Sequence, residues 1–140
     1  MKKYLVIGRP VDHSLSPQLH NYWIKVNKIN AIYDKRDLDD NELKDLINSV
    51  KDKEIDGINI TVPYKKKIIP YLDELSEEAK KTESVNTVFM KDDKLIGHNT
   101  DIEGFELSIR DTNFDVKKKT IFILGAGGVV TTIIYYLNKF

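Results

Sequence analysis

The segment INITVPYK, residues 58–65, places a lysine just beyond two polar side chains. Asn59 and Thr61 alternate with apolar residues, which is the pattern of a strand with one apolar and one polar face. Pro63 ends this strand because proline has no N–H to donate, and Lys65 follows. An amide, a hydroxyl and an ammonium group can hold a hydroxylated substrate and transfer a proton to it. The plainer alternative is a set of hydrogen bonds to a nearby loop and a solvated lysine.

Two serines near the N-terminus form a second candidate site. Ser14 and Ser16 lie in the segment GRPVDHSLSPQLHN, and Ser16 precedes Pro17, a residue that suits the first turn of a helix. Hydroxyl groups beside a helix N-terminus suit a carboxylate or a phosphate. Capping of the helix by Ser16 is the alternative, but it leaves Ser14 unexplained.

Two further residues complete the polar candidates. Asn86, in SVNTVF, is either a turn residue or a ligand contact, and Asp101, in GHNTDIEGF, either caps the following helix or presents a carboxylate to a cleft. Taken singly, the turn and the cap are the simpler interpretations. Together, the hydroxyls, amides, lysine and aspartate of these segments are the groups that a small polyhydroxylated acid requires.

A glycine-rich turn, LGAGGVV, follows an apolar run near the C-terminal end of the sequence. Gly125, Gly127 and Gly128 stand between a predicted strand and a predicted helix, which is the setting of a dinucleotide-binding turn. Glycines there let main-chain N–H groups approach a pyrophosphate. Val130 stands where a third small residue is usual, and a plain strand-to-helix turn is the alternative. These residues do not distinguish NAD from NADP.

Alternating strands and helices position these groups. We expect strands over residues 4–7, 31–33, 55–62, 85–90, 94–97 and 120–124, and helices over 17–26, 43–50, 66–72, 76–81, 101–110 and from the glycine turn to residue 140. This order predicts an α/β protein with a mostly parallel sheet and flanking helices.

The chain is expected to divide into three parts. Residues 1–100 form the first domain, residues 101–118 are a connecting helix and linker, and residues 119–140 open a second domain. That last part holds one strand and one helix, the first β-α unit of an incomplete Rossmann domain.

Composition excludes several classes of protein. The 140 residues include 22 Lys plus Arg and 22 Asp plus Glu, so nothing in the net charge favours nucleic acid or an anionic membrane. There is no cysteine, and the three histidines lack metal-ligand spacing, so we expect neither a disulfide nor a metal site. No apolar run is long enough for a membrane span or a signal peptide, so we expect a cytoplasmic protein.

The motifs taken together resemble the shikimate dehydrogenase family. They occur in the order and spacing of that family and cover nearly the whole chain: Gly8-Arg9-Pro10, His13 to Pro17, His20-Asn21, Asn59 to Lys65, Val85-Asn86-Thr87, Asn99-Thr100-Asp101, Gly104-Phe105 and Gly125 to Gly128. The resemblance implies NADP-dependent, reversible reduction of 3-dehydroshikimate to shikimate, a step toward chorismate and the aromatic amino acids.

The resemblance also implies a role for each candidate residue. Residues 1–100 would bind shikimate and residues 119–140 would begin the NADP-binding domain. Ser14 and Ser16 would hold the substrate carboxylate; Asn59, Thr61, Asn86 and Asp101 would bind its hydroxyls and ring; Lys65 would contact substrate and act as acid/base, paired with Asp101; Gly125, Ala126, Gly127, Gly128 and Val129 would cradle the cofactor phosphates, with Glu77 as a further cofactor contact.

Departures from the family pattern leave alternatives open. Glu83-Ser84 stand where the family usually has Gly-Ala, so we expect an altered turn before Asn86. A quinate/shikimate dehydrogenase is one alternative, although the Ser-x-Ser pair favours shikimate. An acid-binding module without turnover is another, because the nucleotide site in these 140 residues is incomplete and we expect little dehydrogenase activity from them. A homodimer is one of the oligomeric states consistent with the sequence.

Overall fold

Three parallel strands form one half of a six-stranded sheet. The computed structural model describes residues 1–139 and gives the strand order β2-β1-β3-β5-β6-β4. β1 pairs in parallel with β2 and β3, whereas β5 is antiparallel to both β3 and β6, and β4 is parallel to β6. The strands are β1 (Lys2–Gly8), β2 (Ala31–Asp37), β3 (Gly57–Ile60), β4 (Glu74–Leu75), β5 (Thr87–Lys91) and β6 (Lys94–His98). The predicted α/β fold with a mostly parallel sheet is confirmed.

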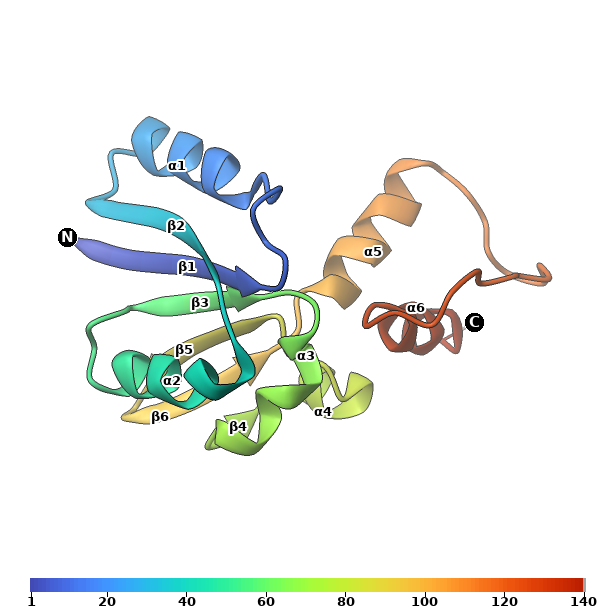
Figure 1. Cartoon of the computed structure of the whole chain (residues 1–140). Coiled ribbons are helices and arrows are strands. Elements are labelled where there is room, and N and C mark those ends of the chain that lie inside the picture. The colour runs from blue at the N-terminus through green and yellow to red at the C-terminus, as the bar shows by residue number, and fades with distance from the viewer. Residues whose placement is uncertain (140) are drawn as a thin grey trace.

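Helices connect the strands and cover the sheet. They are α1 (Ser16–Val26), α2 (Leu43–Lys51), α3 (Tyr64–Lys67), α4 (Glu77–Thr82), α5 (Asp101–Asp111) and α6 (Val130–Leu137), with short 3₁₀ turns at Asp40–Glu42 and Ile69–Tyr71. Figure 1 shows α1 and α2 on different sides of the strands, and α5 and α6 together at one side of the sheet. Phe105 and Tyr136 join these last two helices, with ring centroids 5.3 Å apart.

The two faces of the sheet carry separate apolar cores. Ile7 of β1 is fully buried in the larger core, which includes α2, whereas its neighbour Val6 packs with Tyr33 and with Ile24 of α1. Successive side chains of a strand point to opposite faces, so these neighbours separate the two layers. The α2 helix forms because its apolar residues recur at helical spacing and are buried together: Leu43, Leu46, Ile47 and Val50.

Two sequence predictions about strands are wrong, and one short strand was not predicted. The strand expected over 120–124 does not form; Phe122 is 85% exposed and Leu124 98% exposed, and within residues 1–139 no strand lies beside them. A strand is stable only when a neighbour satisfies its main-chain groups, so only the helix of the expected β-α unit is formed. β3 ends at Ile60, so Val62 is exposed instead of continuing its apolar face. β4 was not predicted, because two residues carry no periodicity.

None of the helices in the described part of the chain is long and apolar enough to cross a membrane. Among the same residues, no three His, Asp or Glu side chains converge as ligands for a metal ion.

Candidate active site

The candidate residues gather where β3 ends and β5 begins. The strand register places Asn59 beside Thr87, and Thr87 beside His98, across three adjacent strands. α3 follows β3 and α5 follows β6, so both helices start at this edge of the sheet (Figure 1). The fold therefore brings the predicted segments around 59–65, 86 and 101 to one place.

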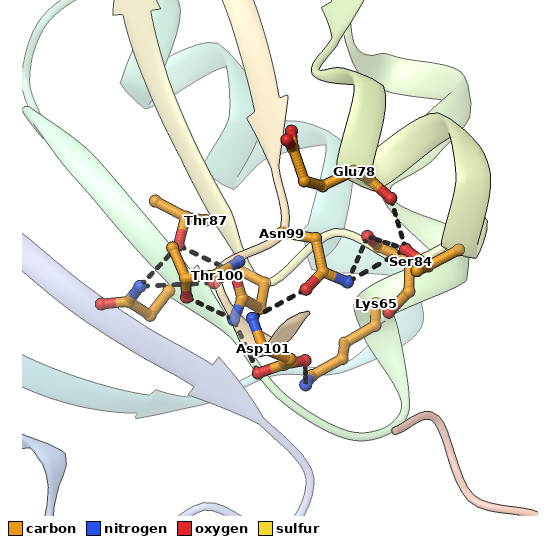
Figure 2. A network of polar contacts seen from close by, with 10 residues as sticks. Lys65, Glu78, Ser84, Thr87, Asn99, Thr100 and Asp101 are labelled. Atoms are coloured by element: carbon orange, nitrogen blue, oxygen red, sulfur yellow. Dashed lines mark hydrogen bonds and ion pairs between the residues drawn. The ribbon is translucent and has the colours of Figure 1, made fainter. Parts of the chain in front are cut away.

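A close ion pair lies at the centre of this edge. Lys65 Nζ lies 2.6 Å from Asp101 Oδ2, and only 16% of the lysine side chain and 22% of the aspartate side chain are exposed. Figure 2 shows the two side chains pointing toward one another, from α3 and from the first residue of α5. Because this pair is mostly removed from water, it is less screened by salt than a surface pair. The structure thus joins the two residues predicted to be catalytic.

Asp101 does not cap the helix that it begins. The residue before the helix is Thr100, which has no side-chain capping bond, and the main-chain N–H of Asp101 donates to Asn99 Oδ1 at 2.8 Å. Within the described residues, neither carboxylate oxygen of Asp101 accepts from a main-chain N–H of the helix; Oδ2 contacts Lys65 Nζ and Oδ1 accepts from Asn86 Nδ2. The capping interpretation is wrong, and the carboxylate faces Lys65 and Asn86 instead.

Asn86 links three parts of the site. Its Nδ2 donates to Asp101 Oδ1 and to Thr100 Oγ1, each at 2.8 Å. Its Oδ1 accepts from the main-chain N–H of Thr100 at 3.1 Å and from Thr87 Oγ1 at 3.0 Å. The side chain therefore fixes the start of α5 as well as the Asp101 carboxylate, a larger role than that of a turn residue.

Asn59 extends this network toward β2. Its Nδ2 donates to Thr87 Oγ1 at 3.1 Å and to the main-chain O of Asn86 at 3.3 Å. Its Oδ1 accepts from the hydroxyl of Tyr33 at 2.7 Å. Burial raises the pKa of Tyr33 above its usual range, so this hydroxyl stays protonated and remains a donor at neutral pH.

The two serines lie at the start of α1, apart from this network. Ser14 Oγ accepts from the main-chain N–H of Ser16 at 3.3 Å, and the helix begins at Ser16. The prediction that Ser16 caps the helix is therefore wrong, and Ser14 is the residue that satisfies an N–H there. Within residues 1–139, no hydrogen bond joins the side chains of Ser14, Ser16 or Thr61 to the Lys65–Asp101 pair.

Thr61 packs against the first strand. Its main-chain N–H donates to Ile7 O at 2.9 Å, and its methyl group lies against Gly8, where an added Cβ would come within 2.4 Å of Thr61 Cγ2. Gly8 is therefore required for close approach between the end of β1 and this segment.

A cavity of about 490 Å³ lies between α3 and the glycine turn. Its lining joins Lys65 to residues of the predicted cofactor set, and includes Val62, Pro63, Lys65, Lys66, Ala126, Gly127, Gly128, Val130 and Thr131. The remaining predicted substrate contacts (Ser14, Ser16, Asn59, Thr61, Asn86 and Asp101) do not line it.

The glycine turn has the features of a phosphate cradle. Gly125 has φ +110°, which favours glycine, and a Cβ added at Gly127 would meet nothing within 4 Å. α6 begins at Val130, whose main-chain N–H donates to Gly127 O at 3.0 Å, and the Oγ1 atoms of Thr131 and Thr132 are buried without a hydrogen-bond partner in the described chain. Glycines at such a turn let main-chain N–H groups approach a phosphate.

Two other residues of the predicted cofactor set lie at different places. Val129 precedes α6 and accepts from Ile133 N at 3.1 Å through its main-chain oxygen. Glu77 lies on the surface of α4, where Lys80 Nζ is 3.1 Å from its Oε1, and it does not line the cavity. A cofactor contact of Glu77 stays a prediction.

The unusual Glu83-Ser84 pair forms the turn before Asn86. Glu83 follows α4 with φ 48°, the left-handed conformation that glycine favours, and Ser84 is completely buried, with no hydrogen-bond partner for its Oγ among residues 1–139. Asn99 Nδ2 donates to Ser84 O at 2.9 Å and holds the turn in place (Figure 2). Glu83 therefore stands on a main-chain conformation that suits glycine, and a change of the turn relative to the family stays a prediction.

Sequence reasoning missed four residues that support the site. Thr87, Asn99 and Thr100 form direct bonds to the predicted residues and occur within the quoted motifs, so their polar types were the available signal. Tyr33 gave no such signal, because in the sequence it is one of the apolar residues expected in a strand over 31–33. In the structure its side chain is 4% exposed.

Comparison with known proteins gives a consistent result. The sequence profile of the shikimate dehydrogenase substrate binding domain matches residues 6–88. Over 138 residues the chain is 60% identical to the NADP(+) shikimate dehydrogenase of Pelagibacter ubique (strain HTCC1062), with 99% of this chain and 52% of that protein aligned.

Two crystal structures have the same fold. Shikimate dehydrogenase 1 of Peptoclostridium difficile has a TM-score of 0.94 and 34% identity, and the match covers 99% of this chain and 52% of that one. The shikimate 5-dehydrogenase of Thermus thermophilus, solved in complex with NADP(H) and shikimate, has a TM-score of 0.90 and 31% identity, with coverages of 99% and 52%. The chain thus spans about half the length of these relatives.

Proposed function

Because the chain belongs to the shikimate dehydrogenase substrate binding domain family, we propose that it binds shikimate and 3-dehydroshikimate and provides the acid/base residues of an NADP-dependent shikimate dehydrogenase. The single observation that carries this proposal is the partly buried Lys65–Asp101 pair at the edge of the sheet. The reaction would serve the formation of chorismate and aromatic amino acids.

Lys65 is the proton donor and acceptor in this proposal. Reduction of the 3-dehydroshikimate carbonyl adds hydride to carbon and a proton to oxygen. The Lys65 ammonium gives that proton and becomes a neutral amine, which regains a proton from water; in the reverse direction the amine takes the proton of the shikimate hydroxyl. The ammonium also stabilises negative charge that develops on the oxygen. Asp101, whose Oδ2 lies 2.6 Å from Lys65 Nζ, holds the ammonium group in position.

The other polar residues hold the acid. Ser14 and Ser16, at the start of α1, offer hydroxyls to the substrate carboxylate, and Asn59 and Thr61 bind hydroxyls of the ring. Asn86 binds a further ring hydroxyl in exchange for its bond to Thr100 Oγ1. Orientation of a substrate against a fixed proton donor supplies a large share of a rate enhancement, so an array of weak contacts is useful here.

NADP fits the glycine turn. Gly125, Ala126, Gly127, Gly128 and Val129 would hold its phosphates, and three of these residues, Ala126, Gly127 and Gly128, line the cavity. Bound NADPH supplies the hydride. The cavity places this turn beside Lys65, and a Cβ added at Gly128 would lie 3.8 Å from Lys65 Cδ.

The division of the chain follows the same reasoning. Residues 1–100 act as the shikimate-binding domain, residues 101–118 connect, and residues 119–140 begin the NADP-binding domain. We place the enzyme in the cytoplasm, with small molecules as its ligands. The zero net charge gives it no electrostatic attraction to nucleic acid or to an anionic membrane. Sedimentation analysis distinguishes a monomer from a homodimer.

The test measures shikimate binding and NADP+-dependent oxidation by the wild-type chain and by Lys65→Ala, with Lys67→Ala as the matched control. Lys67 lies on the same α3 helix in an equally short ion pair, with Asp40 at 2.6 Å, outside the network. Because we expect little oxidation by these 140 residues, binding is the main readout: Lys65→Ala alone should weaken shikimate binding and remove the remaining oxidation. Equal effects of the two variants would refute the assignment of Lys65.

The alternatives differ in what these assays show. Faster oxidation of quinate than of shikimate would make the chain a quinate/shikimate dehydrogenase. Saturable shikimate binding without turnover that Lys65→Ala leaves unchanged would make it an acid-binding module.

A further inference from the structure

Two residues of the predicted acid-binding segment have no role in the proposed chemistry. His20 and Asn21 instead contact Tyr33 on β2. Asn21 Nδ2 donates to Tyr33 O at 2.7 Å, and Asn21 Oδ1 accepts from Tyr33 N at 3.0 Å, so one side-chain amide binds both main-chain polar groups. The His20 ring stacks on the Tyr33 ring, with centroids 4.2 Å apart and an interplanar angle of 5°. These contacts fix both the main chain and the ring of Tyr33.

The sheet register directs this tyrosine at the candidate site. β1 pairs Tyr4 with Tyr33 of β2 and Val6 with Asn59 of β3. Tyr4 and Val6 are two residues apart on one strand and share a face, so Tyr33 and Asn59 lie on that face as well. The Tyr33 hydroxyl reaches across β1 and donates to Asn59 Oδ1 at 2.7 Å.

This bond determines what Asn59 can offer a ligand. Both hydrogens of Asn59 Nδ2 are used, by Thr87 Oγ1 and by the Asn86 main-chain oxygen. Asn59 Oδ1 can accept two hydrogen bonds, and Tyr33 supplies one of them. One acceptor position therefore remains, and it suits a hydroxyl donor. The terminal torsion of asparagine is broad and roughly two-fold, so loss of the Tyr33 bond would let the amide rotate away from this arrangement.

We propose that Tyr33 is a positioning residue for substrate binding, held by His20 and Asn21, whose hydroxyl fixes Asn59 so that Oδ1 accepts from a substrate hydroxyl. The proposal rests on the proposed function, because it takes Asn59 as a substrate contact. The role of the His20-Asn21 pair is then distinct from that of the neighbouring serines. The pair holds Tyr33 on β2, and Tyr33 in turn orients Asn59 on β3, on the far side of β1.

Tyr33→Phe removes only the hydroxyl and keeps the ring that stacks on His20. We expect the dissociation constant of shikimate, measured by titration calorimetry, to rise by roughly three- to tenfold, the equivalent of one hydrogen bond. Tyr64→Phe is the matched control, because Tyr64 is also buried and its hydroxyl donates to the main-chain oxygen of Leu38 in the core. Both variants should unfold at a lower denaturant concentration than the wild-type chain, but only Tyr33→Phe should bind shikimate more weakly.

A double-mutant cycle with Asn59→Ala separates positioning from a general structural effect. If Tyr33 acts through Asn59, then Tyr33→Phe weakens binding in the wild-type background and has no further effect once Asn59 is alanine. Equal losses in both backgrounds, or unchanged binding by Tyr33→Phe, would overturn the inference. Unchanged binding by Asn59→Ala, or no shikimate binding by the wild-type chain, would instead overturn the proposed substrate site.

Discussion

Replacement of Glu83 by glycine should stabilise the protein without moving the site. Glu83 has φ 48° at the end of α4, and a side chain in this left-handed conformation is disfavoured by about 1–2 kcal/mol. Glycine removes that strain but gives the unfolded chain more freedom, which offsets about 0.5–1 kcal/mol. Glu83 Oε2 lies 4.0 Å from Lys66 Nζ, an exposed pair that contributes roughly a few tenths of a kcal/mol at most.

The expected net gain is about 0.5–1 kcal/mol in the free energy of unfolding, or roughly 2–4 °C in Tm for a chain of this size. Urea unfolding followed by circular dichroism measures it. Lys53→Gly is the control, because Lys53 is an exposed residue with φ 61° after another helix, far along the chain from Asn86. Both changes should stabilise the protein, and neither should alter shikimate binding.

Two results would refute this reasoning. A lower unfolding midpoint for Glu83→Gly would mean that the glutamate side chain stabilises the turn by more than its strain. A changed shikimate affinity would mean that the turn does not hold Asn86 in the same position with either residue.

Three further predictions concern packing and pH. Ser84→Ala should raise the free energy of unfolding by about 1 kcal/mol in urea titrations, because the buried Oγ of Ser84 has no partner in the described chain; a loss of stability would show that the hydroxyl is satisfied. Gly8→Ala should lower the unfolding free energy by about 1–3 kcal/mol, because the new Cβ would lie 2.4 Å from Thr61 Cγ2; thermal unfolding no earlier than that of wild type would contradict the close packing. Burial lowers the pKa of His20 below its usual value of 6.5, so as the pH falls the unfolded chain binds a proton at His20 before the folded chain does. The free energy of unfolding should therefore decrease as the pH drops through 6.5. His20→Gln should flatten that part of the pH profile, and an unchanged slope would exclude His20 as its source.

Periodicity in the sequence predicted the parts of the fold that depend on apolar burial. The alternation around Asn59 located β3 and its polar face, and the spacing of Leu43, Leu46 and Ile47 located α2. Elements that depend on partners were harder to predict. The strand over 120–124 needs a neighbouring strand, which a local pattern does not reveal.

The candidate site was predictable by residue type but not by hydrogen-bond partner. Several polar side chains compete for each helix start, and small differences in geometry decide which one reaches the free N–H. Ser16 and Asp101 were therefore considered as caps, whereas Ser14 and Asn99 are the residues that accept from N–H groups at these helix starts. Tyr33 could not be identified from the sequence, because its contact with Asn59 depends on the order of three strands.

The most direct test of the account is an NMR measurement of the lysine ammonium groups during a shikimate titration. Lys65 and Lys67 lie on the same helix, and each has a carboxylate oxygen at 2.6 Å, so one serves as the internal control for the other. The account predicts that the Lys65 side-chain resonance shifts saturably with shikimate while that of Lys67 does not. A shift of Lys67 alone, or saturable changes elsewhere with Lys65 unmoved, would contradict the assignment of the Lys65–Asp101 pair to the substrate site.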